Sequence, residues 1–158
     1  MTRIAFYAPI KPPDHPIPSG DRLIARNLMA ALELANFGTF LASKYIAYSK
    51  READGILASR KARALAEADR LITELKNAPP GIWLTYHPYC KAPDWIGPHV
   101  SSRLGVPYVT VEAAKTGQGF ENGGDLWERW RAEAQAGIRV ADLHLCFKPT
   151  DRKYLECL

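Results

Sequence analysis

Short apolar runs alternate with helix-like segments along the whole chain, and this alternation constrains the fold more than any other feature. The apolar runs fall at residues 4–8, 39–42, 82–86, 106–111 and 142–147. Between them lie loops and stretches whose apolar residues recur at helical spacing. Strands that alternate with helices form βαβ units with right-handed crossovers. The sequence therefore predicts an α/β fold with a mainly parallel sheet of about five or more strands.

The segments between these runs carry start and stop signals for helices. Ser19 is a candidate N-cap ahead of Asp21, and we expect the first helix to run from there to Gly38. Further helices are predicted over residues 54–77, 95–104 and 126–138, and from a cap at Thr150 to the end of the chain. With helices on both faces of the sheet, the expected architecture is a Rossmann-like three-layer αβα domain. The unfinished last helix indicates a piece of something longer.

Length and composition narrow the class of protein. A chain of 158 residues predicts one domain, and 47% hydrophobic with 24% charged residues is ordinary for a globular one. No apolar run reaches the roughly 18 residues of a membrane-spanning helix, and the N-terminal apolar stretch is too short for a signal peptide. These features predict a cytoplasmic protein. The formal charge of +4 fits a phosphate-bearing partner or an anionic membrane surface without requiring either.

Cysteine usage bears on redox chemistry and on metal binding. The chain has three cysteines, Cys90, Cys146 and Cys157, and no CxxC pair. An odd count without such a pair argues against a disulfide framework and against a zinc site. Free thiols in a reducing compartment are the expected state.

The loop after the first strand is the first candidate site, because ligands of open parallel sheets bind at the carboxyl ends of the strands. This loop holds five prolines and ends in Ser19-Gly20-Asp21 at a helix start. A helix N-terminus attracts phosphate, and Gly20 would let an anion approach the backbone. The alternative is a plain capped helix start, since no GxGxxG or GxxxxGK[ST] pattern is present. Asp21 would partly cancel the attraction for an anion, unless it binds an acceptor hydroxyl.

Residues with ionisable side chains also follow the third and fourth predicted strands. His87 comes directly after the third strand, where an imidazole could act as a general base or relay a proton. A structural or surface histidine is the alternative, and His15, His99 and His144 are weaker candidates. Glu112 and Lys115 follow the fourth strand and could line the same crevice as substrate- or phosphate-binding residues, or belong to a solvated loop.

Two further groups of residues have a structural and a functional interpretation. Trp127 and Trp130, three residues apart on a helix, are expected to pack in the core rather than to form a sugar-binding platform. Arg60, Lys61 and Arg63 are expected to form a solvated helix face, with contact to lipid phosphate as the alternative. No basic patch interleaved with aromatic residues is present, so nucleic acid is not an expected partner.

Four segments of the chain are informative in order: the RIAFYAP strand with the Ser19-Gly20-Asp21 loop, IWLTYHPY, LGVPYVTVEA and VADLHLCFKPTDRKYL. They resemble the N-terminal domain of a retaining glycosyltransferase of the GT-B fold, family 4 (glycosyl transferases group 1). Together they span nearly all of the chain. The sequence departs from the family at Ser19, where the family usually has Gly-Gly, and at Glu112, where related enzymes often carry a threonine–histidine arrangement.

The resemblance implies that residues 1–158 are the single acceptor-side domain of such an enzyme, with the C-terminal nucleotide-sugar domain absent from this chain. The implied activity is transfer of a sugar, hexosyltransferase-type, from a nucleotide-sugar donor to an acceptor hydroxyl with retained configuration. The domain alone is expected to be inactive. His87 matches the family histidine near the transferring sugar, and Gly20 matches the loop that faces the donor phosphates.

The resemblance also implies partners. These are the nucleotide sugar, a glycan or lipid-linked acceptor and the second domain, while contact with the inner face of a membrane and self-association stay open. No cofactor or metal is expected, because GT-B enzymes bind the diphosphate with a helix dipole and basic side chains, and the sequence has no DxD pattern.

Two other functions remain as alternatives. One is a non-catalytic Rossmann-like module that binds a nucleotide, a glycan or a phosphorylated partner, since fold alone does not decide function. An oxidoreductase or a response-regulator domain is disfavoured by the missing GxGxxG and by the lack of clustered aspartates after the first strand.

Overall fold

A computed structural model describes residues 1–50, 55–114 and 125–158 of the chain and confirms the α/β prediction. Five strands form one sheet in the order β2-β1-β3-β4-β5, and every neighbouring pair is parallel. Their bounds are β1 (Arg3–Tyr7), β2 (Gly38–Ser43), β3 (Ile82–Tyr86), β4 (Tyr108–Val111) and β5 (Leu143–Leu145). The strand order reverses between β1 and β3, which is where open parallel sheets bind their ligands.

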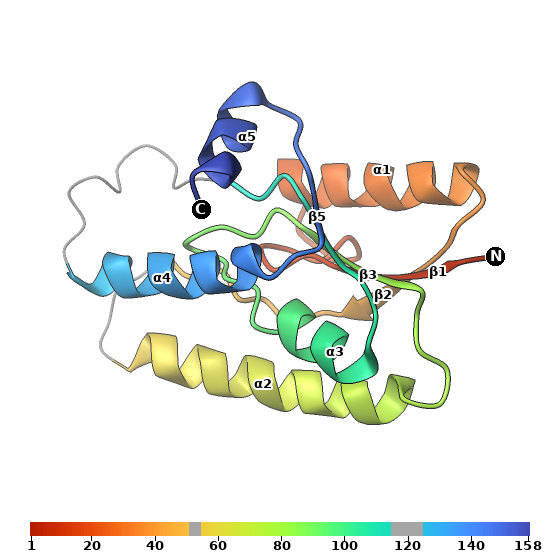
Figure 1. Ribbon diagram of the computed structural model, residues 1–158, viewed down its shortest axis with the longest axis horizontal. Helices are drawn as coiled ribbons and strands as arrows, with labels where there is room; N and C mark the ends of the chain where they lie inside the picture. The colour runs from red at the N-terminus through yellow and green to blue at the C-terminus, as the bar shows by residue number, and fades with distance from the viewer. Residues whose placement is uncertain (51–54, 115–124) are drawn as a thin grey trace.

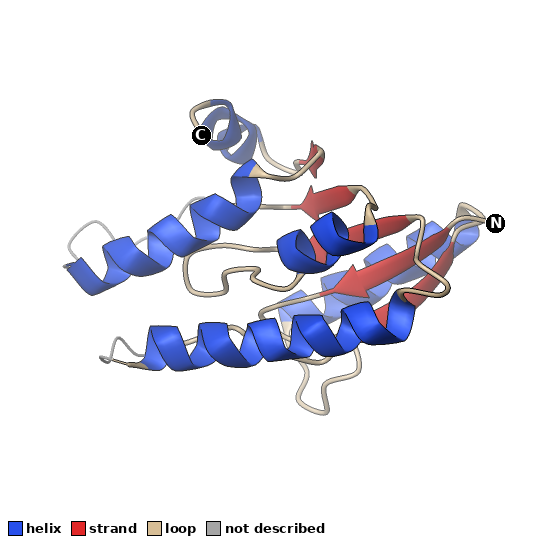
Figure 2. Ribbon diagram, turned by 60° about the horizontal axis from the view of Figure 1, so that its bottom comes forward, coloured by secondary structure: helices blue, strands red, loops and turns tan. Residues whose placement is uncertain are grey.

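Helices cover both faces of the sheet and give the three-layer arrangement that the sequence predicts (Figures 1 and 2). On one face lie α1 (Gly20–Leu34) and α5 (Pro149–Glu156). On the other lie α2 (Ile56–Leu75), α3 (Gly97–Leu104) and α4 (Asp125–Arg139). Along the described stretches of the chain, no helix combines the length and the apolar character needed to cross a membrane.

Several element boundaries differ from the sequence predictions. The first helix ends at Leu34 rather than at Gly38, because Asn36 adopts the left-handed conformation (φ 69°) that terminates it. Gly38 instead begins β2. The last helix is not capped by Thr150, since it begins at Pro149, whose fixed φ suits the first turn. The fourth and fifth strands are shorter than the apolar runs 106–111 and 142–147.

Helix α2 buries a slightly different stripe from the predicted one. Helical spacing alone predicts a face through Leu57, Lys61, Leu65, Ala68, Ile72 and Leu75. The buried residues are Ala64, Ala68 and Leu71, with larger side chains partly buried on either side. Small alanines at the centre of the contact allow the helix backbone to lie close to the rest of the core.

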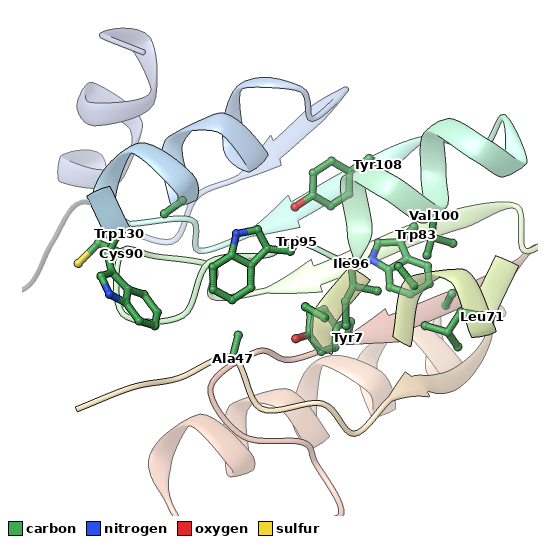
Figure 3. Close-up of a cluster of buried hydrophobic side chains, with 14 of the residues drawn as sticks. Tyr7, Ala47, Leu71, Trp83, Cys90, Trp95, Ile96, Val100, Tyr108 and Trp130 are labelled. Carbon is green, nitrogen blue, oxygen red and sulfur yellow. The ribbon is translucent and has the colours of Figure 1, made fainter. Parts of the chain in front are cut away.

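The hydrophobic core has two parts, one on each face of the sheet. The part under α2, α3 and α4 is rich in aromatic side chains: Tyr7, Trp83, Trp95, Tyr108, Trp127 and Trp130 (Figure 3). The rings of Trp95 and Trp130 lie 5.9 Å apart, centroid to centroid. Trp127 and Trp130 are 5% and 0% exposed, so they pack in the core as predicted and present no sugar platform. The second part lies between the sheet and α1.

A buried carboxylate, Asp94, organises the first part of the core. Its Oδ2 accepts hydrogen bonds from the hydroxyls of Thr85 (2.6 Å) and Tyr108 (2.9 Å). Its Oδ1 accepts the backbone N–H groups of Ile96 (2.9 Å) and Gly97 (2.8 Å). Asp94 thereby joins the loop after β3 to the neighbouring strands and to the start of α3.

Gly97 has no room for a side chain, and Gly97→Ala is expected to destabilise the fold by about 2–3 kcal/mol. A Cβ there would clash with the Asp94 carboxylate and would lie 2.6 Å from the Tyr108 ring and 2.7 Å from Trp83 Nε1. The matched control is Gly20→Ala, since a Cβ on Gly20 meets nothing within 4 Å. Chemical denaturation followed by circular dichroism measures both. Equal stability of the two variants would contradict the packing argument.

Candidate functional site

The candidate site lies at the carboxyl edge of the sheet, beside the point where the strand order reverses. The loop after β1 leads there into the N-terminus of α1, and His87 follows the last residue of β3. Ser19 is the N-cap of α1, as predicted, and its Oγ accepts the backbone N–H of Arg22 at 3.2 Å. The first turn of α1 and the end of β3 thus meet at this edge.

His87 and Asp21 form a hydrogen-bonded pair across this edge. Nδ1 of His87 lies 3.1 Å from Oδ1 of Asp21, with side chains 24% and 36% exposed. An ionised carboxylate only accepts hydrogen bonds, so Nδ1 carries the proton and donates it. Within residues 1–50, 55–114 and 125–158, no protein group hydrogen bonds to Nε2 of His87. His87 lines a pocket at this edge.

The backbone at the ends of β3 and β4 is strained. His87 and Glu112 both adopt the left-handed conformation, with φ of 57° and 54°. This conformation costs a non-glycine residue roughly 1–2 kcal/mol. Hydrogen bonds hold it in place: the N–H of His87 donates to the Val111 carbonyl and that of Glu112 to the Leu145 carbonyl, each at 2.8 Å. Backbone strain of this kind, held in place by hydrogen bonds to neighbouring strands, is typical of functional sites.

A pocket of about 240 Å³ opens at the His87–Asp21 pair. It is lined by Ile10, Lys11, Ser19, Asp21, Tyr48, His87 and Tyr89. Tyr48 reaches it because the N–H groups of Ala47 and Tyr48 both donate to the Pro9 carbonyl, at 2.9 and 3.2 Å. The ring of Tyr89 stacks on that of His87, with centroids 5.3 Å apart and planes at 24°.

The electrostatics of the pocket keep Asp21 ionised. The hydrogen bond from His87 lowers the pKa of Asp21, with further lowering from the charges of His87 and Lys11, and these outweigh the effect of burial. Burial is the main reason that the pKa of Tyr89 lies well above its ordinary value. At neutral pH the pocket therefore presents a carboxylate and an uncharged phenol.

A second carboxylate, Glu112, lies next to this pair on the side of β4. It is 7% exposed, and Nζ of Lys148, the residue before α5, lies 3.3 Å from its Oε1. Burial raises the pKa of the Tyr86 hydroxyl, and the negative charges of Glu112 and Asp21 raise it further. Tyr86 therefore lies within electrostatic range of both carboxylates.

The structure brings together part of the predicted set. Ser19, Asp21 and His87 line one pocket. Gly20 lies between Ser19 and Asp21 in the chain, and the space that a side chain would take at Gly20 is open. Glu112 belongs to the adjoining group with Tyr86 and Lys148 rather than to the pocket lining. Lys115 lies outside the described residues.

The weaker histidine candidates have local contacts and do not line the pocket. Nδ1 of His15 accepts the N–H of Ile17, and His99 pairs with Asp69 on the surface of α2. His144, within β5 as predicted, hydrogen bonds to the Thr110 hydroxyl at 2.6 Å, and burial lowers its pKa.

Sequence reasoning missed four residues at this edge: Lys11, Tyr48, Tyr89 and Lys148. Tyr89 lies two residues after His87, and Lys148 directly precedes α5. Both residues therefore lie in loops that follow predicted strands, and this position could have identified them as candidate site residues. Tyr48 had no such signal, because it reaches the pocket through a loop folded back onto the first one.

Larger hollows elsewhere on the described part of the molecule carry charged side chains but no hydrogen-bonded histidine–carboxylate pair in their lining, and one of them, of about 420 Å³, is lined by His144, Cys146 and Arg152. One of about 520 Å³ lies near Pro107 at the amino end of β4, and one of about 380 Å³ lies between α2, α3 and α4. In the second, Lys61 and Trp95 are both bound to Glu133, at 2.9 Å each. We therefore assign the site to the carboxyl edge.

Metal binding and resemblance to known proteins complete the description of the site. Among the residues that the structure describes, no three His, Cys, Asp or Glu side chains converge as they would around a metal ion. No protein-family model matches the chain, and no curated protein resembles it closely enough to count as a match.

Proposed function

We propose that this chain is the acceptor-side domain of a retaining glycosyltransferase, which transfers a sugar from a nucleotide-sugar donor to an acceptor hydroxyl. The observation that carries the proposal is the His87–Asp21 pair, 3.1 Å apart, facing an open pocket beside the reversal point of a parallel sheet. A histidine oriented by a carboxylate, with its other nitrogen open to a ligand, is suited to proton transfer.

In the proposed reaction, a bond forms between the acceptor oxygen and the anomeric carbon while the bond from that carbon to the donor phosphate breaks. The acceptor hydroxyl loses its proton. Nε2 of His87 would accept this proton or relay it toward the leaving diphosphate, or would contact the transferring sugar. Asp21 holds the ring by accepting from Nδ1 and balances positive charge that develops on it.

The pocket is open to solvent, which suits a site completed by a second domain that binds the nucleotide sugar. Titration of the 158-residue chain with UDP, GDP and ADP separates this proposal from the non-catalytic alternative. We expect no saturable binding at micromolar concentration, since the nucleotide would bind to the other domain. Micromolar binding of a nucleoside diphosphate would favour the stand-alone binding module instead.

The direct test is sugar transfer by the native gene product that contains this domain. Nucleotide-sugar donors and hydroxyl-bearing acceptors are supplied, and nucleoside diphosphate release and the anomeric configuration of the product are measured. We expect turnover with retained configuration. Inverted products, or no transfer from any UDP-, GDP- or ADP-sugar, would overturn the proposal.

A further inference from the structure

We infer that the outward face of α1 binds a second copy of this chain, with the two α1 helices packed antiparallel about a two-fold axis. This face lies apart from the carboxyl-edge pocket, because Asp21 in the first turn is the one residue of α1 that lines the pocket. The inference is independent of the proposed function.

Helix α1 is apolar on the side that faces solvent as well as on the side that faces the sheet. The residues of its inner side, which pack on the sheet, are Ala25, Leu28, Met29 and Leu32. Its outer side exposes Leu23 (59%) and Leu34 (90%), although α1 is the outer layer on its face of the sheet (Figure 1). Helix α2, the outer layer on the other face, exposes no large apolar side chain along its length. A helix that is apolar all round is normally covered on both sides, so α1 indicates a partner.

The outward residues of α1 have the spacing of a helix-pairing stripe. This outer stripe consists of four exposed residues at intervals of four, three and four: Leu23, Asn27, Ala30 and Leu34. Side chains at these intervals form one line along a helix and interlock with a second helix. In an antiparallel pair, Leu23 of one copy meets Leu34 of the other at each end. The smaller Asn27 and Ala30 meet at the centre, where they let the two helices approach closely.

The charges beside the outer stripe complement one another in the same arrangement. Arg26 and Glu33 lie seven residues apart, so they flank the stripe on the same side. The antiparallel pair places Arg26 of each copy opposite Glu33 of the other, once on each side of the two-fold axis. Among the residues that the structure describes, neither side chain has an ion-pair partner. Glu33 accepts only a hydrogen bond from the Thr39 hydroxyl, at 2.7 Å, so a second copy would balance both charges.

The charge of α1 favours a second copy over an anionic membrane surface. The helix carries two positive and two negative side chains: Arg22, Arg26, Asp21 and Glu33. Helices that lie on membranes are instead rich in Lys and Arg on their polar face. A helix without net charge gains nothing from anionic lipid, whereas two such helices attract one another where their opposite charges face.

The length of the outer stripe sets the expected affinity. From Leu23 to Leu34 the helix extends about 17 Å. Such a contact is smaller than a standard interface, which buries roughly 800 Å² on each partner. We therefore expect a reversible dimer with a dissociation constant on the order of 10 μM.

The first test is sedimentation velocity of the 158-residue chain from about 1 to 500 μM, a range that brackets this affinity. We expect a reversible monomer–dimer equilibrium. Leu34→Lys should raise the dissociation constant at least about tenfold, because an apolar contact that the dimer makes twice is lost. The matched control is Val140→Lys, which places the same charge on another exposed apolar residue (59%) and should leave the equilibrium unchanged.

Exchange of the two charges tests the antiparallel arrangement itself. Arg26→Glu and Glu33→Arg should each raise the dissociation constant about tenfold, because each places like charges opposite one another twice. The double variant Arg26→Glu/Glu33→Arg should return to within about threefold of the wild type, since every facing pair is again of opposite sign. An equimolar mixture of the two single variants should form a heterodimer of the same strength, for the same reason.

Three results would overturn the inference. One is a chain that stays monomeric at every concentration, and another is a dimer that Leu34→Lys and the single charge variants leave intact. The third is a monomer that binds phosphatidylglycerol vesicles through Leu34, which would assign the outer stripe to a membrane. Circular dichroism checks that each variant is folded. If Leu34→Lys does not fold, the charge exchange decides, because Arg26 and Glu33 are both exposed.

Discussion

Replacing Asp94 by alanine is expected to lower the free energy of unfolding by about 3–5 kcal/mol, enough to bring a domain of ordinary stability close to unfolding. The substitution leaves four donors in the core without their acceptor: two hydroxyls, from Thr85 and Tyr108, and two backbone N–H groups, at Ile96 and Gly97. The Trp83 indole N–H, which donates to Thr85 Oγ1 at 3.0 Å, loses a rigid partner as well.

Asp94→Asn should cost less than Asp94→Ala, because the amide oxygen can still accept both backbone N–H groups and the amide nitrogen can donate to the two hydroxyl oxygens, although the two hydroxyl protons lose their acceptor. Asp69→Ala on the exposed surface of α2 is the control, with an expected change of about 0.5 kcal/mol or less. Urea denaturation followed by circular dichroism measures all three variants. An Asp94→Ala variant as stable as the control would contradict this account of the core.

Asp94 also makes the free energy of unfolding depend on pH. Burial raises the pKa of Asp94 above the ordinary 3.8, although its four hydrogen bonds lower it. A raised pKa in the folded state means that the fold favours the protonated form. The stabilisation that this shift contributes is therefore fully present below the ordinary pKa of an aspartate, and it is lost as the pH rises through the raised pKa of Asp94 in the folded state. The stability of the wild type relative to Asp94→Asn should fall from acid to neutral pH, and a rise would contradict the dominance of burial.

Replacing His87 by asparagine is expected to reduce kcat/KM for sugar transfer by the native gene product roughly 10²–10³-fold, the usual effect of removing a general acid–base group. Asparagine is the chosen substitute because it tolerates the left-handed conformation that position 87 requires (φ 57°). The loss then reports on the imidazole rather than on the backbone. Initial rates of nucleoside diphosphate release give the measurement.

His99→Asn is the matched control, since His99 pairs with Asp69 away from the carboxyl edge and its loss should leave transfer unchanged. Asp21→Asn should also reduce transfer, and its effect should be non-additive with that of His87→Asn because the two side chains act as one hydrogen-bonded unit. Unchanged kcat/KM in His87→Asn would contradict the role assigned to this histidine. Strictly additive effects of the two substitutions would show that Asp21 and His87 do not act as one unit.

Local signals predicted where most elements lie, because period and capping depend on neighbouring residues. The Ser19 cap occurs as the sequence indicates, and the proline in the first turn of α3 and the left-handed Gly105 after it are local signals of the same kind. The first helix ends before Gly38 because Asn36 can adopt the left-handed conformation almost as a glycine does. Threonine is a common N-cap residue, but the last helix begins at Pro149, so Thr150 lies within its first turn.

The parallel αβα architecture and the placing of His87 at a carboxyl edge were determined by the sequence itself, since alternation and apolar content are properties of short segments. Only the tertiary structure decided that Asp21 meets His87 across 66 residues, that Lys148 reaches Glu112 and that Asp94 is buried. Asp94 looks in the sequence like any polar loop residue after a proline. Two of its four donors, the N–H groups of Ile96 and Gly97, are local, but its burial and its bonds to Thr85 and Tyr108 join strands that only folding brings together, and hydrophobic period does not encode such contacts.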